Sequence, residues 1–145
     1  MAQPTDLQNL ARRALLIRAK ADGELLDLIP AASIDPDGEP SWPIMLIETP
    51  TTRRLNAACV RGAEVSFDVH AFARARKVGE QVVETGRDHV SRIGGTIERT
   101  FADNVIDLEN GAKCRIRFSD MQMLRDGTPD DWHWFAQLNC RVLAA

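Results

Sequence analysis

The side chains best suited to chemistry in this chain are its three histidines and three cysteines, together with the acids near them. His70 lies two residues after Asp68 in a segment that alternates like a strand, which predicts both side chains on one face. His133 follows two aspartates, but no nucleophile stands at a fixed spacing from either histidine. The chain contains no Gly-x-Ser-x-Gly, no phosphate-binding glycine loop and no His-Glu-x-x-His sequence. The sequence therefore gives no positive evidence for an enzyme, although catalytic groups can assemble from distant segments.

The cysteines are Cys59, Cys114 and Cys140, an odd number of residues that lie far apart without a Cys-x-x-Cys pair. No histidine accompanies them at the spacing of zinc ligands. Cys114 and Cys140 occupy apolar strand positions, which is typical of small core residues with free thiols. We therefore expect no catalytic residues, no cofactor and no metal site.

The composition is that of a globular protein of 145 residues, with 44% hydrophobic and 27% charged residues. We expect a single domain spanning residues 1–145. The formal charge of −3 gives no electrostatic reason for nucleic-acid binding over the whole surface, and we expect no specific nucleic-acid partner. No apolar run is long enough to span a bilayer, and the N-terminal residues lack the layout of a signal peptide. Cytosolic synthesis without membrane attachment is the expectation.

Two segments alternate so regularly that they predict strands with one buried face. In residues 61–73 the apolar face carries Val65, Phe67, Val69 and Ala71. In the final strand the apolar face carries Trp132, Trp134, Ala136, Leu138, Cys140 and Val142. The two tryptophans at the start of the final strand predict a large buried area at one end of the sheet.

The first of these strands is followed by residues with helical spacing. This spacing predicts a helix from Ala75 to Ile93 that continues directly from the strand. Gly79 and Gly86 lie on the apolar stripe of this helix, and we interpret both as positions where the helix approaches the sheet closely. His89 lies on the same stripe and is interpreted as a hydrogen-bonded core residue.

The N-terminal region is predicted to be helical. Apolar residues at helical intervals, with Thr5 and Gln8 at capping-box spacing, predict an amphipathic helix over residues 6–21. This helix is expected to close near Gly23. Residues 25–29 are apolar and end at a proline, which indicates one further helical turn.

The segments between these elements are assigned by composition. Residues 32–34 are expected to form a short strand, and residues 35–43, with three prolines, a loop. The apolar run 44–47 is typical of a central strand covered on both faces. Residues 50–59 are polar and without clear periodicity, so we expect a flexible loop or arm. Residues 96–101 are expected to be extended, because two consecutive glycines precede them.

A hairpin is predicted around Asn110-Gly111, and its register follows from the apolar pattern. A two-residue turn would mix core and solvent residues on one face, whereas a three-residue loop with Gly111 left-handed keeps them apart. The three-residue register pairs Leu108 with Ala112, Ile106 with Cys114 and Asp107 with Lys113. After this hairpin the apolar residues change from even to odd numbers, which predicts a bulge or break around Ser119-Asp120.

The candidate interface residues are aromatic or basic side chains that the predicted core does not use. They are Trp42, Arg53, Arg54, Lys113, Arg115 and Arg117. Trp42, in the proline-rich loop, either covers the edge of the core or anchors a partner. The last three residues form a basic stripe on the outer face of a strand, which is either solvated or in contact with an acidic neighbouring subunit.

Three segments together resemble a known protein family. They are Pro43-Ile44-Met45-Leu46-Ile47, the strand and its exit from Val65 to Arg76, and Arg125-Asp126-Gly127 through His133, Phe135 and Arg141-Val142. Preceded by an amphipathic helix, this order resembles the tail-completion proteins of long-tailed bacteriophages and prophages, which are related to tail terminators and head–tail joining proteins. The chain departs from that family in having no tyrosine, although members often carry an aromatic residue near the start of the central strand. Residues 50–59 match no pattern of the family.

The resemblance implies an α+β fold, with a mixed, mostly antiparallel sheet and two main helices packed on one face. It implies a structural role without catalysis, in which a ring of copies, typically six-fold, caps the tail tube and joins it to the head connector. The implied partners are further copies of the chain, the tail-tube protein and the head–tail connector protein. Assembly is expected in the cytoplasm of the bacterial host, and the final location in the virion tail.

Two other functions remain open at the level of sequence. A small-molecule-binding or enzymatic α+β domain predicts a deep pocket with convergent polar groups and shifted pKa values. A nucleic-acid-binding module requires Arg53, Arg54 and the basic stripe to form one patch with salt-dependent DNA binding.

Overall fold

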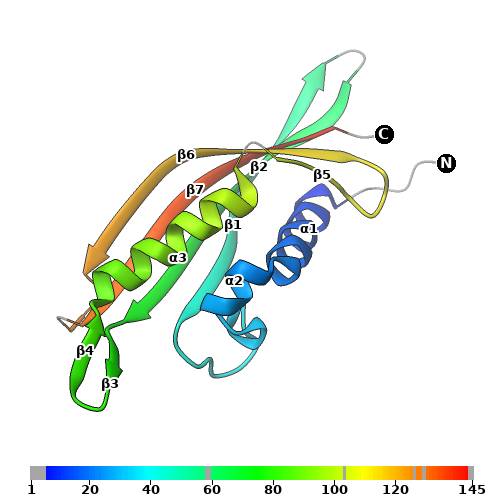
Figure 1. The fold of residues 1–145 in the computed structure, drawn as a ribbon. Helices are drawn as coiled ribbons and strands as arrows, with labels where there is room; N and C mark the ends of the chain where they lie inside the picture. Colours follow the sequence, from blue (N-terminus) through cyan, green and yellow to red (C-terminus); the bar gives the residue numbers. More distant parts are fainter. Residues whose placement is uncertain (1–5, 58–59, 103, 126, 129, 144–145) are drawn as a thin grey trace.

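A five-stranded sheet with helices on one side forms the body of the protein (Figure 1). The computed structural model describes residues 6–57, 60–102, 104–125, 127–128 and 130–143. The elements in chain order are α1 (Leu7–Ala21), α2 (Gly23–Leu28), a 3-10 turn (Ala31–Ser33), β1 (Ile44–Ala57), β2 (Val60–Arg74), β3 (Arg76–Val78), β4 (Gln81–Glu84), α3 (Gly86–Phe101), β5 (Val105–Asp107), β6 (Lys113–Arg125) and β7 (Asp131–Leu143). The sheet has the order β1-β2-β7-β6-β5, and β3 and β4 form a separate hairpin. Every named pair is antiparallel. The predicted α+β class with a mostly antiparallel sheet is therefore confirmed.

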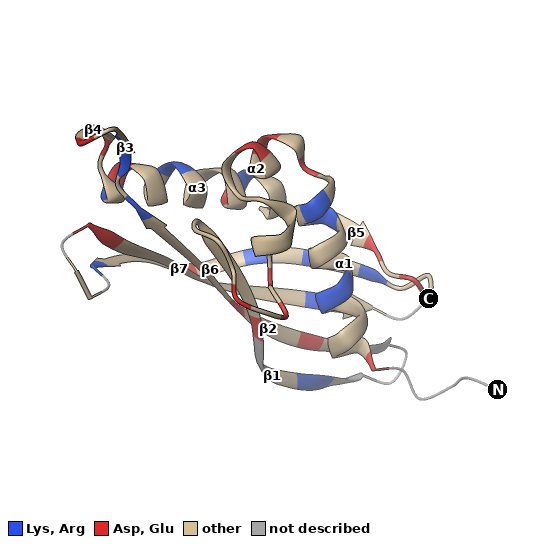
Figure 2. Ribbon diagram, turned by 90° about the horizontal axis from the view of Figure 1, so that it is seen from below, with Lys and Arg blue, Asp and Glu red and all other residues tan. Residues whose placement is uncertain are grey.

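The helices share one face of the sheet and leave the other face open. Figure 2 shows α1, α2 and α3 on the same side, with no described helix over the opposite side. The apolar sides of β2 and β7 meet the two long helices, and Val65, Phe67, Val69 and Ala71 are fully buried there. Because strand side chains alternate between faces, the polar positions of these same strands all lie on the open side.

Asp22 joins the N-terminal helices and connects them to α3. It follows the last residue of α1 and caps α2, where its carboxylate accepts the backbone N–H groups of Glu24 and Leu25. The hydroxyl of Thr100 in α3 donates to Asp22 at 2.6 Å, and this bond is the main reason why the pKa of Asp22 is lowered. At the other end of α1, Asp6 accepts the backbone N–H of Asn9. The predicted cap residue, Thr5, lies outside the described residues.

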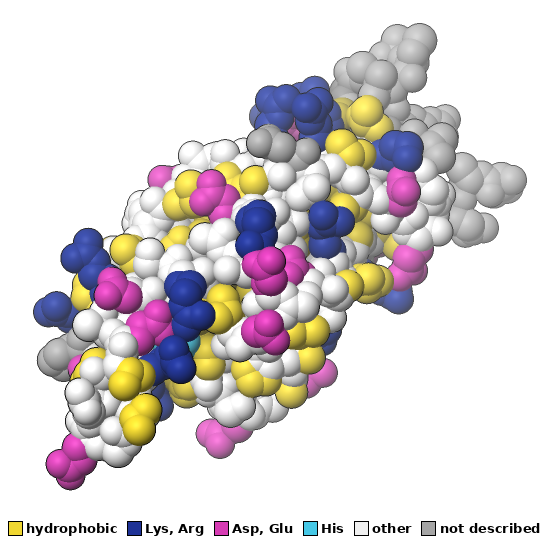
Figure 3. Space-filling model, in the orientation of Figure 1, with side chains coloured by type: hydrophobic (Ala, Val, Ile, Leu, Met, Phe, Trp, Pro, Cys, Tyr) yellow, Lys and Arg dark blue, Asp and Glu magenta, His cyan; other side chains and the backbone are white. Residues whose placement is uncertain are grey.

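The predicted helix from Ala75 to Ile93 is wrong in its first half. Residues 76–84 form the β3–β4 hairpin, in which Gly79 adopts a positive φ of 64° at the turn. The helix begins at Gly86, after Thr85 caps it by accepting the backbone N–H of Asp88 at 3.1 Å. A local turn and a cap thus outweigh a helical spacing of apolar residues. The valines of the hairpin, Val78, Val82 and Val83, are exposed. Figure 3 shows hydrophobic side chains on the molecular surface.

Helix α3 continues past Ile93 and contains two glycines that lie close to other parts of the chain. Gly94 faces the Trp134 indole so closely that a Cβ would overlap the ring, and Gly86 faces the Asp130 carbonyl in the same way. Close helix–sheet approach is therefore confirmed for Gly86 but not for Gly79, where an added Cβ would meet nothing within 4 Å. Residues 96–101, predicted to be extended, belong to α3, because Ile97 and Phe101 are fully buried in the core at helical spacing.

The strand predicted as central, residues 44–47, is the start of the edge strand β1. Residues 50–57, predicted as part of a loop or arm, continue β1, which pairs with β2 to its end in a hairpin that projects from the body (Figure 1). The register shifts between Glu48 and Thr51, an irregularity of a kind that is common at sheet edges. The predicted short strand at 32–34 is instead a 3-10 turn followed by one parallel bridge, from Ile34 to Met45.

The β5–β6 hairpin and its bulge agree with the sequence. Ile106 pairs with Cys114, and Asp107 pairs with Lys113. Gly111 has a φ of 84°, as the three-residue loop requires. The register of β6 against β7 shifts between Phe118 and Asp120, which confirms the bulge. His89 is also buried as predicted, with its Nδ1 atom 2.8 Å from the Arg74 carbonyl oxygen.

None of the helices within the described residues combines the length and the apolar character that crossing a membrane requires.

Candidate interaction surface

The open face of the sheet carries a row of charged side chains across four strands. Antiparallel pairing aligns Arg53 of β1 with Glu64 of β2, Glu64 with Arg141 of β7, and Arg141 with Arg115 of β6. A second row, two residues further along, consists of Thr51, Ser66, Asn139 and Arg117. Because directly opposed residues on one face lie about 5 Å apart, each row forms a continuous band.

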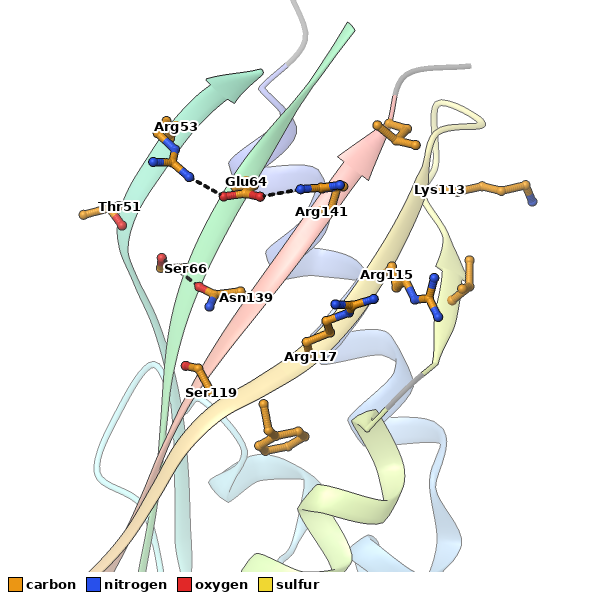
Figure 4. A pocket seen from close by; sticks show the side chains of 13 residues that line it. Thr51, Arg53, Glu64, Ser66, Lys113, Arg115, Arg117, Ser119, Asn139 and Arg141 are labelled. Atoms are coloured by element: carbon orange, nitrogen blue, oxygen red, sulfur yellow. Dashed lines mark hydrogen bonds and ion pairs between the residues drawn. The ribbon is translucent and has the colours of Figure 1, made fainter. Parts of the chain in front are cut away.

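These rows line a broad depression with a volume of about 1010 Å³ (Figure 4). Its basic side chains are Arg53, Lys113, Arg115, Arg117 and Arg141, and its one acidic side chain is Glu64. The protein as a whole has a formal charge of −3, so the depression is a basic region on an acidic molecule. Charge segregation of this kind favours contact with an acidic surface.

Glu64 organises the upper part of the depression. Its carboxylate accepts from Arg53 at 2.7 Å and from Arg141 at 2.9 Å, so one acid connects three strands (Figure 4). The hydrogen bond from Arg141, followed by that from Arg53, lowers the pKa of Glu64 below its ordinary value. Glu64 therefore stays ionised at neutral pH and is poorly suited to act as a general acid.

Two arginines in the depression are uncompensated. Within the described part of the chain, neither Arg115 nor Arg117 has a hydrogen-bond or ion-pair partner. Lys113, the third member of the predicted stripe, is paired with Asp107 at 2.6 Å, as the sequence predicted. The charge available to a partner is therefore concentrated on Arg115 and Arg117.

The structure brings together four of the six predicted interface residues. Arg53, Lys113, Arg115 and Arg117 line the depression. Arg54 is exposed but pairs with Ala63, whose side chain points to the helix-bearing face, so Arg54 lies on the opposite side from Arg53. A single patch containing Arg53, Arg54 and the basic stripe, which the nucleic-acid alternative requires, is therefore not formed.

Trp42 lies apart from the basic depression. Its ring is half-buried, contacts Phe72 edge-on with centroids 6.3 Å apart, and lies 3.8 Å below the Arg74 guanidinium. It lines a second hollow together with Arg74 and His89. The Trp42 ring thus covers the end of the sheet next to β1. The alternative role of Trp42, as an anchor for a partner, remains a prediction.

The sequence did not identify Glu64 and Arg141 as parts of this surface. Both occupy polar positions in strands that were predicted with the right faces, so the alternation already placed them outside. The sequence did not show that the strands of Glu64 and Arg141 pair with each other, because the two residues are separated by 77 positions in the chain. Only the order β1-β2-β7-β6 brings Arg53, Glu64, Arg141 and Arg115 into one row.

The other half of the open face is aromatic. His70 and Phe72 of β2 lie beside His133 and Phe135 of β7, with ring centroids 4.3 to 6.4 Å apart. All four side chains are half-buried, although no helix among the described residues covers this side of the sheet (Figure 2). The open face therefore has a basic end toward the β1–β2 turn and an aromatic end toward Trp42.

Known proteins share this fold. One similar solved structure is a chain of the virion of a native gene transfer agent particle, with a TM-score of 0.76 and 12% sequence identity. The match covers 97% of this chain and 100% of that chain, and at this identity it shows the fold alone. No curated protein sequence matches the chain. Residues 13–143 match the family model for tail completion protein gp17. Because that match spans nearly the whole chain, the protein belongs to the tail completion protein gp17 family and is a phage structural protein.

Proposed function

We propose that this protein caps the tail tube of a phage or prophage and joins it to the head connector as a ring of identical copies, without catalysis. Membership of the tail completion family supports a place in the tail, and the likeness to a chain of a virion particle supports incorporation into a virion. We take the whole chain to act as one domain and six copies as the working stoichiometry of the ring. Assembly would take place in the host cytoplasm before the head is joined.

The observation that carries the proposal is the basic depression on the open face. A closed ring requires two different patches on each copy, one complementary to the other. The depression supplies a basic patch with Arg115 and Arg117 free to pair. The loop 35–43 supplies an acidic patch, because Asp37 and Glu39 are exposed there. We infer that the loop of one copy contacts the depression of the next.

Reversal of charge tests this contact. Light scattering after size exclusion measures the mass of the chain alone and with the tail-tube or connector protein. The wild type is expected to bind at least one of the two, and the Arg115→Glu/Arg117→Glu variant to lose assembly. Adding Asp37→Lys and Glu39→Lys to that variant is expected to restore it. Failure of the wild type to bind either protein contradicts the proposed function.

A matched control uses cations outside the depression. Arg54 and Lys20 are both exposed, and Arg54 lies on the opposite side of the sheet. The Arg54→Glu/Lys20→Glu variant changes the net charge by the same amount and is expected to assemble like the wild type. Equal loss in both double variants would show that total charge, and not the depression, governs assembly.

The features of the depression do not favour the enzymatic alternative. The one group in it with a shifted pKa is Glu64, among the residues described, and the shift keeps it ionised. A catalytic acid or base working near neutral pH requires a shift toward 7 instead. We also expect no salt-dependent DNA binding, and its detection with loss in the Arg115→Glu/Arg117→Glu variant would favour the nucleic-acid alternative.

A further inference from the structure

Three potential metal ligands meet on the open face between its basic and aromatic halves. Glu48 of β1 is directly opposite Asp68 of β2, and His70 is the next residue of β2 on the same face. One ligand atom from each side chain lies within 4.8 Å of the other two. The Nε2 atom of His70 is 3.6 Å from an Oε2 atom of Glu48, which is too far for a hydrogen bond.

The hydrogen bonding of these side chains provides a second, independent observation. Among the described residues, the buried side-chain atoms without any hydrogen-bond partner are Asp68 Oδ1 and His70 Nε2. Both atoms belong to this cluster. Folded proteins rarely leave a buried polar atom unpaired, because its desolvation costs about 1–3 kcal/mol. A single ion bound between them would pair both atoms at once.

His70 is held in the orientation that a metal ligand requires. Its Nδ1 atom lies 2.7 Å from Nε2 of His133, and the two rings are stacked with centroids 4.9 Å apart. Metal-binding histidines usually donate the second ring N–H to a neighbouring acceptor, which fixes the tautomer and the ring plane. In the tautomer in which His70 donates Nδ1–H to His133, the lone pair of His70 Nε2 is available to an ion at the carboxylates.

We propose that Glu48, Asp68 and His70 bind one divalent transition-metal cation, with Zn²⁺ as the best fit. One imidazole and two carboxylates are borderline ligands that suit Zn²⁺, and the two negative charges balance its charge. Calcium and magnesium prefer oxygen ligands alone, so both are expected to bind much more weakly. A water molecule or a donor from a partner completes the coordination.

The position of the site suggests what the ion would do. Glu48 is the last β1 residue in register before the shift to Thr51, where the projecting part of the β1–β2 hairpin begins. An ion joining Glu48 to Asp68 and His70 would fix β1 to β2 at this irregularity. The bound form would therefore present the hairpin in a more defined direction. This inference does not depend on the proposed role in the tail.

Titration of the full-length, tag-free chain tests the site. Calorimetry with Zn²⁺ is expected to give one saturable site per chain, and Ca²⁺ to give none at the same concentrations. Asp68→Asn and His70→Gln are each expected to weaken Zn²⁺ binding by more than about 100-fold. Loss of a residue that only orients a metal ligand usually weakens metal binding by less than this. Asp107→Asn, at an exposed acid paired with Lys113, is the matched control and should bind like the wild type.

Two further readouts separate loss of binding from loss of folding. Zn²⁺ should shift the ring-nitrogen resonances of His70 and leave those of His89 unchanged. Without metal, Asp68→Asn should melt at or above the temperature of the wild type, because Oδ1 of Asp68 is buried without a hydrogen-bond partner. Only the wild type should gain stability from Zn²⁺. If a variant fails to fold, Glu48→Gln, at a largely exposed acid, replaces it. Absence of a saturable Zn²⁺ site, or equal affinity in all variants, overturns the proposal.

Discussion

Gly94 and Gly95 are adjacent in α3 but lie in different surroundings. Gly94 is buried against the Trp134 indole, where a Cβ has no room, whereas a Cβ on Gly95 would meet nothing within 4 Å. The same residue type is therefore required at one position and only costs helix stability at the next. At the scale of single residues, neighbours supplied by other strands decide what each side chain contributes.

We predict opposite effects of alanine at these two positions. Gly94→Ala should lower the free energy of unfolding by about 1–3 kcal/mol, because the added carbon forces the indole to move. Gly95→Ala should raise it by about 1 kcal/mol through the higher helix propensity of alanine. Urea denaturation followed by circular dichroism measures both. Similar values for the two variants would contradict the close contact between Gly94 and Trp134.

A second residue-scale prediction concerns Glu64 and acid. Its pKa in the folded protein lies below the ordinary value of 4.5, mainly because Arg141 and then Arg53 donate to it. A depressed carboxyl pKa stabilises the fold fully above pH 4.5, and this stabilisation disappears as the pH falls through the folded value. The stability difference between the wild type and Glu64→Gln should therefore be largest near neutral pH and shrink below pH 4.5.

Denaturation at a series of pH values measures this difference. Glu80→Gln, at an exposed acid on the β3–β4 turn, is the control for the loss of one negative charge. A difference between wild type and Glu64→Gln that stays constant from neutral pH to pH 3 would show that the arginines do not stabilise the ionised carboxylate.

At the scale of elements, local caps and turns fix where each element begins. Thr85 starts α3, and Gly79 turns the β3–β4 hairpin, against an apolar spacing that favoured one long helix. Glu84 then holds the hairpin to the helix by accepting from Arg92 at 2.8 and 3.0 Å. The bond with Arg92 is the main cause of the lowered pKa of Glu84. The hairpin is thus attached to α3 by one ion pair while its valines stay exposed.

The capping bond at Thr85 leads to an element-scale prediction. Thr85→Ala should lower the free energy of unfolding by about 1 kcal/mol, because it leaves the N–H of Asp88 without its acceptor. Thr96→Ala, in the middle of the same helix, is the matched control. Thr96 donates only to the Arg92 carbonyl, so its loss should cost little. Equal costs from thermal or urea unfolding would argue against a helix start at Gly86.

At the scale of the whole molecule, one covered face and one open face define what the protein can do. The core lies between the helices and the sheet, so its thiols are sealed from solvent. Cys114 and Cys140, on neighbouring strands, are fully buried. The contact between the two thiols, together with burial, raises the pKa of Cys140 and disfavours its reactive thiolate.

The burial of Cys114 and Cys140 predicts how fast their thiols react with a labelling reagent. In a Cys59→Ser background, both remaining thiols should react with an aromatic disulfide reagent only as fast as the protein unfolds globally. The labelling rate should rise with urea in parallel with the unfolding measured by circular dichroism. Rapid reaction of either thiol under native conditions would show that the sheet opens locally between β6 and β7.

The sequence by itself determined the faces of the strands, the β5–β6 register and the bulge at Ser119-Asp120. These features follow from an alternation of period two and from one glycine turn, which act between residues close in the chain. The family resemblance rested on the same local patterns and was confirmed by the match over residues 13–143. Three of the candidate interface residues, Lys113, Arg115 and Arg117, were also predicted from these faces, whereas Arg53 was predicted in a loop.

Only the tertiary structure decided the order of the strands, the edge position of β1 and the open side of the sheet. Arg53, Glu64, Arg141 and Arg115 form a row because β1, β2, β7 and β6 are neighbours, and nothing in a local pattern selects one strand order over another. For the same reason Glu48 reaches Asp68 and His70 only through pairing. The continuation of α3 beyond Gly94 and Gly95 depended on packing as well, because Ile97 and Phe101 are fully buried against neighbours that no local pattern supplies.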